Sequence, residues 1–121
     1  MQVRSVILVV TTGGAGRFID VVYDLGRTPI VVNPQKAELA MRAFKREFDQ
    51  DITLAVLHGM CVDDANELAE KLKKICRNMQ IVSMSNEVGE STREADSLCD
   101  VLIPSSRIDL QNTLGNLCSS K

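Results

Sequence analysis

The fold of this chain is decided by a stretch near its N-terminus, Val6–Val10 (VILVV), which runs directly into Thr11–Arg17 (TTGGAGR). Five consecutive apolar residues, three of them valine, predict a strand that is buried on both faces, as in a parallel sheet. The glycines that follow allow the backbone to turn tightly before a helical pattern begins near Arg17. In an open parallel sheet, ligands lie at the carboxyl ends of the strands, so the residues after Val10 are the first functional candidates.

Working outward from this stretch, further apolar runs alternate with helical patterns. The runs that predict strands are 29–32, 52–57, 79–84 and 101–103. The segments with helical spacing are 17–25, 34–48, 64–76, 91–99 and 105–117. Alternation with short connections predicts a parallel sheet covered by helices on both faces. Five such units in 121 residues favour the flavodoxin-like strand order 2-1-3-4-5, so we expect a single (βα)5 three-layer α/β domain over residues 1–121.

Polar residues mark the expected helix starts. Asn33 followed by Pro34 predicts a helix with asparagine as N-cap and proline in the first turn. Asp64 with Glu67 resembles a capping box, with aspartate in the capping role. Ser105 and Ser106 are expected to cap the last helix, whose Leu110, Leu114 and Leu117 share one face. The expected buried face of the second helix consists of Ala37, Ala40, Met41, Phe44 and Phe48.

Charge and length argue against several classes of function. The chain carries 14 lysines and arginines against 16 acidic residues, a formal net charge of −2. A nucleic-acid surface is normally basic, so we expect no nucleic-acid partner. A basic group at Lys71, Lys73, Lys74 and Arg77 ends a predicted helix, where cations complement the helix dipole. No apolar run approaches the ~18 residues of a membrane span, and residues 1–4 do not resemble a signal peptide, so we expect a cytoplasmic chain without a membrane partner.

The four cysteines are Cys61, Cys76, Cys99 and Cys118. They are widely spaced, form no CxxC pair and accompany a single histidine. This pattern offers neither a zinc signature nor a disulfide framework. We therefore expect reduced thiols and no bound metal.

At this point the chain resembles a response-regulator receiver domain, the family of the bacterial chemotaxis response regulator. The resemblance covers essentially the whole chain and rests on length, element order and local landmarks. Two polar residues follow Val6–Val10, as the acidic pair follows the first strand of receivers. Asp64 fits the loop after the third strand, and Ser85 stands where receivers carry threonine or serine. Ile103 and Pro104 match the Lys-Pro sequence that closes the fifth strand of the family.

The resemblance implies a phosphorylation site whose key residues are replaced here. Receivers transfer a phosphoryl group to an aspartate after the third strand, using Mg²⁺ held by the acidic pair. In this chain the acidic pair aligns with Thr11 and Thr12, and two neutral hydroxyls lack the charge to hold that ion. The acceptor aligns with Leu57 or His58, and the lysine that would pair with the phosphoryl group aligns with Ile103. Ser85 alone is retained, so the chain resembles a degenerate receiver without metal or cofactor.

Two features at the same edge suggest other chemistry. Histidine side chains titrate near neutral pH, so His58 is a conceivable phosphohistidine or general base, although a lone histidine beside Gly59 is more often structural. The glycine-rich turn, with Gly13, Gly14, Gly16 and Arg17, is a possible anion site because its N–H groups precede a helix. It matches neither the P-loop nor the GxGxxG pattern, and a simple tight turn is the favoured interpretation.

These observations favour a phosphorylation-independent signalling module that acts through protein partners or self-association, without enzymatic activity. The resemblance places the contact surface on residues 91–100, 101–103 and 105–117, with the first helix, 17–25, as a second docking surface. One alternative is a small-molecule or nucleotide sensor that uses the glycine-rich turn. Another is an unrecognised small flavodoxin-like enzyme.

Overall fold

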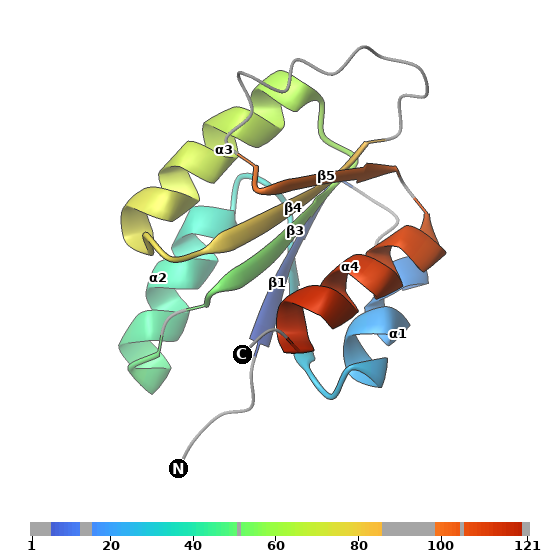
Figure 1. The fold of residues 1–121 in the computed structure, drawn as a ribbon. Coiled ribbons are helices and arrows are strands. Elements are labelled where there is room, and N and C mark those ends of the chain that lie inside the picture. Colours follow the sequence, from blue (N-terminus) through green and yellow to red (C-terminus); the bar gives the residue numbers. More distant parts are fainter. Residues whose placement is uncertain (1–5, 13–15, 51, 86–98, 105, 120–121) are drawn as a thin grey trace.

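A computed structural model of the protein describes residues 6–12, 16–50, 52–85, 99–104 and 106–119 (Figure 1). These residues contain five strands and four helices. The strands are β1 (Val6–Thr11), β2 (Thr28–Val32), β3 (Leu54–His58), β4 (Gln80–Ser85) and β5 (Val101–Pro104). The helices are α1 (Gly16–Asp24), α2 (Ala37–Phe48), α3 (Val62–Ile75) and α4 (Arg107–Ser119). The helix expected at 91–99 lies almost wholly outside the described residues.

The strands form one parallel sheet in the order β2-β1-β3-β4-β5, as the sequence predicts. The register places Thr11 beside His58, His58 beside Met84, and Met84 beside Ile103. Because all five strands run in the same direction, their carboxyl ends lie at one edge, and β1, β3, β4 and β5 are paired there in register. Residues 11, 58, 84 and 103 therefore form a continuous row across that edge.

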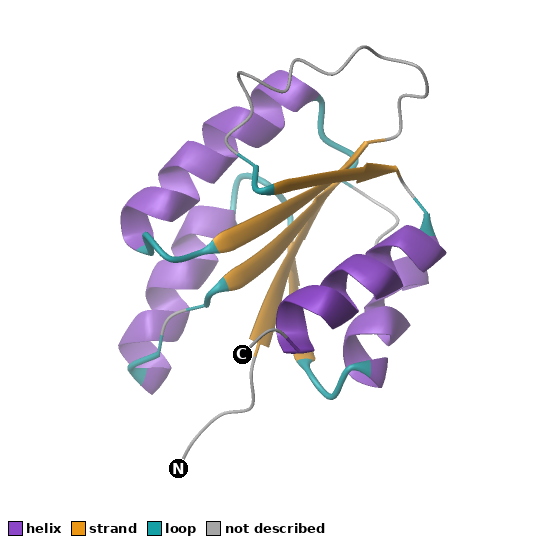
Figure 2. Ribbon diagram, viewed as in Figure 1, coloured by secondary structure: helices purple, strands orange, loops and turns teal. Residues whose placement is uncertain are grey.

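Helices cover both faces of the sheet, with α2 and α3 on one side and α1 and α4 on the other (Figure 2). Side chains along a strand alternate between faces, so β1 contributes to two separate cores. Leu8 and Val10 pack in the core beneath α2 and α3. Ile7 and Val9 pack in the core beneath α1 and α4. This three-layer arrangement accounts for the uninterrupted apolar run at the start of the chain.

The expected start of the second helix is wrong by three residues. Helix α2 begins at Ala37, and residues 34–36 form a turn. In that turn the backbone N–H of Lys36 donates to Oδ1 of Asn33 at 3.0 Å. The asparagine side chain therefore closes a local turn and does not cap the helix, a competition typical of this residue.

The buried face of α2 is only partly as expected. Ala37, Met41 and Phe44 are buried, whereas Phe48 is 48% exposed. Phe48 is the last residue of the helix, and its ring lies 4.9 Å from that of Phe44. Phe48 packs beside Phe44 at the end of the apolar stripe, where about half of its surface is left exposed.

The capping box predicted at Asp64 and Glu67 is also wrong. Helix α3 begins at Val62, with Cys61 as N-cap and no side-chain capping bond. Asp63 and Asp64 lie in the first turn, where carboxylates stabilise the positive end of the helix dipole.

The start of the last helix is closer to expectation. Ser106 directly precedes α4, and its Oγ lies 3.5 Å from the backbone N–H of Asp109, a long capping contact. Ser105 lies outside the described residues. Leu110 and Leu114 are buried in the core beneath α1 and α4, and Leu117 packs against it. The leucine stripe predicted from the sequence is therefore confirmed.

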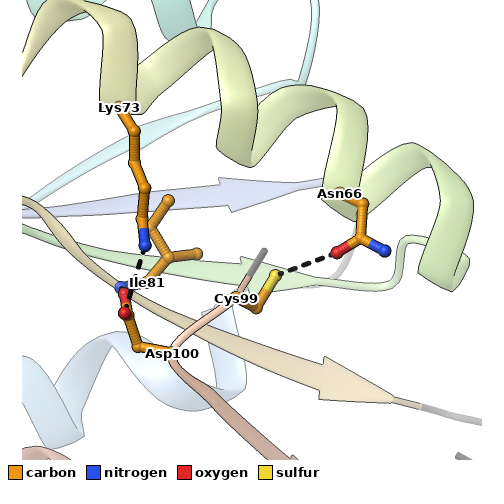
Figure 3. Close-up of polar contacts among 5 residues, drawn as sticks. All are labelled: Asn66, Lys73, Ile81, Cys99 and Asp100. Atoms are coloured by element: carbon orange, nitrogen blue, oxygen red, sulfur yellow. Dashed lines mark hydrogen bonds and ion pairs between the residues drawn. The ribbon is translucent and has the colours of Figure 1, made fainter. Parts of the chain in front are cut away.

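The chain enters the last strand through a polar anchor at Cys99 and Asp100 (Figure 3). The backbone N–H of Asp100 donates to the carbonyl of Ile81 at 2.9 Å. In return, the Asp100 carboxylate accepts the backbone N–H of Ile81 at 2.8 Å and meets Nζ of Lys73 at 3.1 Å. The Cys99 thiol lies 4.0 Å from Oδ1 of Asn66. These contacts tie the start of β5 to both α3 and β4.

Candidate functional site

The candidate site is the row at the carboxyl edge of the sheet, and Thr11 and His58 form its centre. Thr11 is only 8% exposed, and its Oγ1 lies 3.3 Å from Nδ1 of the neighbouring His58. The His58 ring also meets the ring of Phe18 edge-on, with centroids 5.1 Å apart. A hydroxyl on one side and an aromatic ring on the other therefore hold the imidazole in place. The aromatic contact joins β3 to α1 and could not be predicted from local sequence.

The structure distinguishes between the two positions that align with the phosphoacceptor. Leu57 is fully buried in the core beneath α2 and α3. His58 is half-buried and reaches the edge beside Thr11. The position available for chemistry at the end of β3 is therefore occupied by an imidazole.

The remaining members of the row lie on β4 and β5. Ser85 is the last residue of β4 and pairs in register with Pro104. Ile103 pairs with Met84 and packs against the core beneath α1 and α4. Met84 is fully buried and was not among the predicted site residues. The β4–β5 side of the row thus carries apolar side chains at residues 84 and 103.

The loops after β1 and β3 are fitted closely to each other. The Thr12 hydroxyl donates to the carbonyl of Gly59 at 3.3 Å. Gly59 has a φ of +80°, and a Cβ at this residue would lie 2.7 Å from Oγ1 of Thr12. Glycine is required here for both reasons, since an L side chain rarely adopts this backbone and this one would meet Thr12. The second predicted hydroxyl therefore positions the loop after β3.

A hollow of about 730 Å³ opens beside Thr12, between the loops that precede α2 and α3. Its lining includes Asn33, Cys61, Asp64, Glu67 and Lys71. The Lys71 ammonium pairs with Glu67 at 3.7 Å, and the Asp64 carboxylate adds negative charge. The lining is therefore polar with an acidic balance, which disfavours a phosphate group in this hollow.

The predicted anion site on the glycine-rich turn lies partly outside the described residues. Gly13 and Gly14 are not among them, and Gly16 and Arg17 form the first residues of α1. That site stays a prediction. Within the described ranges, no three histidine, cysteine or acidic side chains gather as a metal site would require. In the same ranges, Cys61 and Cys76 are free thiols, and no helix is both long and apolar enough to cross a membrane.

Solved structures that share this architecture over nearly the whole chain include the following two. A two-component response regulator from Clostridium difficile superposes with a TM-score of 0.71 at 15% sequence identity, covering 97% of this chain and 98% of the regulator. A pilus assembly protein, CpaE, from Burkholderia thailandensis gives a TM-score of 0.68 at 13% identity, covering 95% of this chain and 98% of CpaE. No protein-family profile matches the sequence, and neither does any curated protein.

The chain therefore has the fold of response-regulator receiver domains, which confirms the resemblance noted in the sequence. At these identities the likeness establishes the fold and leaves the chemistry to the residues of the edge. Those residues are a hydroxyl bonded to an imidazole, a second hydroxyl bonded to a glycine carbonyl, and apolar side chains on β4 and β5.

Proposed function

We propose that this chain is a receiver-like signalling module that works without phosphorylation, by binding a protein partner or a second copy of itself. The observation that carries the proposal is the composition of the edge row. Thr11 on β1 and Thr12 in the loop after β1 align with the acidic pair of receivers. His58, at the end of β3, occupies the phosphoacceptor position at this edge, and Ile103 on β5 aligns with the lysine.

Phosphoryl transfer to a carboxylate needs an aspartate acceptor and a divalent cation, which prefers charged oxygen ligands. The Thr11 and Thr12 oxygens are neutral, and both already make a hydrogen-bonding contact within the fold. Asp63 and Asp64 are exposed in the first turn of α3, where the helix dipole accounts for their presence. The Thr11 hydroxyl and the Phe18 ring contact the imidazole of His58 and account for its position, so we propose no enzymatic role for it.

The proposed contact surface is the exposed side of β5 and α4. Strand β5 is an edge of the sheet, and α4 is anchored through Leu110 and Leu114, which leaves its outer side in solvent. Ile108 on that side is 69% exposed, the largest exposed fraction among the big apolar side chains of the described residues. Its substitution is therefore a direct probe of this surface with little cost to the core.

The phosphorylation part of the proposal is tested by amide NMR of labelled protein with Mg²⁺ and beryllium fluoride, a phosphoryl mimic. We expect no saturable shifts at Thr11, Thr12 or His58. Saturable shifts confined to this edge would show that a phosphoryl site persists and would overturn the proposal.

The contact surface is tested by sedimentation over a range of protein concentrations and by titration with any partner that is identified. Ile108→Lys is expected to weaken self-association or partner binding while the unfolding curve stays unchanged. Leu39→Lys is the matched control, because Leu39 is 60% exposed on α2, which covers the other sheet face. Equal effects of the two variants would exclude β5 and α4 as the contact surface.

One observation favours a second candidate function, that of a small-molecule sensor. The hollow of about 730 Å³ beside Thr12 is large enough for a metabolite. Its acidic balance favours a neutral or cationic ligand over a nucleotide. Amide shifts around Thr12, Gly59 and Cys61 on addition of Mg·ATP would instead support the nucleotide hypothesis that the glycine-rich turn suggested.

A further inference from the structure

Apart from the hollow beside Thr12, a charged surface lies between α2 and α3, which cover the sheet face opposite to α1 and α4 (Figure 2). A hollow of about 440 Å³ is lined by four cationic side chains and one apolar residue: Arg42, Lys45, Arg46, Lys74 and Ile75. We call this hollow the basic groove. All four cationic residues are exposed, and Ile75 is half-buried. None of the described residues that line the groove is acidic.

The helix dipole explains why most of these cations are present, but their grouping around one hollow also creates a local excess of positive charge. Lys45 and Arg46 lie in the last turn of α2, and Lys74 lies in the last turn of α3, where positive charge is favourable. Arg42 lies earlier in α2 and pairs with Glu38 at 3.2 Å. Even with Arg42 paired, the lining of the hollow carries an excess of positive charge, which attracts an anion.

We propose that the basic groove binds an acidic segment of a partner protein, whose carboxylates meet the arginine and lysine side chains. Arginine forms bidentate bonds with carboxylates, and Arg42 and Arg46 stand on the same side of the groove, on α2. Ile75 offers an apolar contact in the lining, which suits a protein segment with mixed acidic and apolar residues.

Other polyanions fit this groove less well. Its lining includes no aromatic side chain on which nucleic-acid bases could stack. The whole chain carries a net charge of −2, so its overall field does not attract a long polyanion. An anionic membrane is a broad surface, whereas this feature is a hollow between two helices. A narrow acidic protein segment matches both the shape and the local charge.

The test uses the full chain with short poly-L-glutamate as the probe, followed by amide NMR and calorimetry at several salt concentrations. We expect saturable shifts on the C-terminal halves of α2 and α3 and an affinity that falls as salt increases. Charges are screened beyond about 8 Å at physiological ionic strength, so titrations at low salt give the clearest signal.

A pair of charge-reversal variants makes the test specific. Arg46→Glu with Lys74→Glu is expected to lower the affinity for poly-L-glutamate about tenfold or more, since two favourable ion contacts become repulsive. Arg27→Glu with Lys36→Glu changes the net charge equally outside the groove and is expected to have a much smaller effect. Unfolding curves of both variants check that the fold is kept.

Three outcomes would overturn the proposal. The first is an equal loss of affinity in the two charge-reversal variants, which would mean that only net charge matters. The second is tighter binding of an oligothymidine than of poly-L-glutamate. The third is tighter binding to vesicles of phosphatidylcholine and phosphatidylserine. None of these outcomes involves Ile108 or the carboxyl edge, so failure here is distinguishable from failure of the proposed function.

Discussion

Substitution of Asp100 by alanine tests how the last strand is attached to the sheet. Asp100 stands just before β5, where its carboxylate accepts the backbone N–H of Ile81 at 2.8 Å (Figure 3). Ile81 is fully buried, so removal of the carboxylate leaves a buried donor without its acceptor. Hydrogen bonds to charged groups contribute about 1.5–3 kcal/mol, and an unsatisfied buried donor costs a similar amount.

The ion pair of Asp100 with Lys73 adds less. Its two side chains are 38% and 29% exposed, and such pairs contribute below about 1 kcal/mol after solvent screening. We therefore expect Asp100→Ala to lower the free energy of unfolding by about 2 kcal/mol, with the hydrogen bond to Ile81 as the larger part. For a domain of this size, that corresponds to a fall in melting temperature of roughly 8 °C.

Urea unfolding followed by circular dichroism measures the effect, with two variants that separate the contacts. Asp100→Asn keeps an oxygen that can accept the Ile81 N–H, so its cost is expected to stay below about 1 kcal/mol. Lys73→Met removes only the ion pair and is expected to cost about 0.5 kcal/mol. If Asp100→Ala and Lys73→Met destabilise the protein equally, the hydrogen bond to Ile81 contributes nothing and the reasoning is refuted.

Two further predictions follow from local geometry. Gly59→Ala places a Cβ 2.7 Å from Oγ1 of Thr12 at a φ of +80°, and we expect it to lower the free energy of unfolding in urea by about 2 kcal/mol. Gly26→Ala is the control, because Gly26 has a φ of +75° but no atom within 4 Å of the new Cβ, and we expect a loss of only about 1 kcal/mol. Equal losses in the two variants would exclude a role for the Thr12 contact. The hydrogen bond from Arg107 lowers the pKa of Asp20 below its ordinary 3.8, so the pair should stabilise the fold above that pH and stop doing so as the pH falls through the lowered pKa. The difference in melting temperature between the wild type and Arg107→Gln should therefore shrink below pH 3.8, and a constant difference would contradict this assignment.

The fold could be predicted from the sequence because each strand is an apolar run and each helix carries an apolar stripe. The residues Ile7–Val10 are buried and face both layers of helices, as expected for a strand of a parallel sheet covered on both faces. Five βα units in a chain of this length favour the flavodoxin-like strand order, which the structure confirms. The burial of apolar side chains is the dominant favourable term in folding, so the apolar runs and stripes determine which segments become strands and helices even where a helix start is mispredicted.

Helix starts were predicted less well because several weak interactions compete there. Asn33 can cap a helix or close a turn, and its hydrogen bond to the Lys36 N–H shows that the turn prevails. Helix α3 begins after Cys61 although Asp64 is a better capping residue by type. Each alternative differs by about 1 kcal/mol, which tertiary packing easily outweighs.

The candidate site shows the same division between local and tertiary information. The sequence placed Thr11 and His58 at one edge, since both follow a predicted strand. It could not supply the ring contact between His58 and Phe18, which depends on how α1 lies on the sheet. It also could not supply the burial of Leu57, which leaves His58 as the residue at the edge.

The basic groove is a consequence of topology that net charge conceals. In a parallel α/β fold, every connecting helix runs opposite to the strands, so all helix N-termini lie near the carboxyl edge of the sheet. Helix dipoles favour acids at that end and bases at the other. Helices α2 and α3 follow this rule, with Glu38, Asp63 and Asp64 in their first turns, and lysine or arginine in their last turns.

Two adjacent helices with the same charge order gather their bases at one end and their acids at the other. The acidic balance of the hollow beside Thr12 and the cationic lining of the basic groove are therefore two ends of one charge gradient along α2 and α3. A formal net charge of −2 averages over that gradient, and it argues only against partners large enough to sense the whole molecule. A short acidic segment interacts mainly with the cationic lining of the groove. The net charge therefore argues against a nucleic-acid partner, whereas the groove favours a short acidic protein segment.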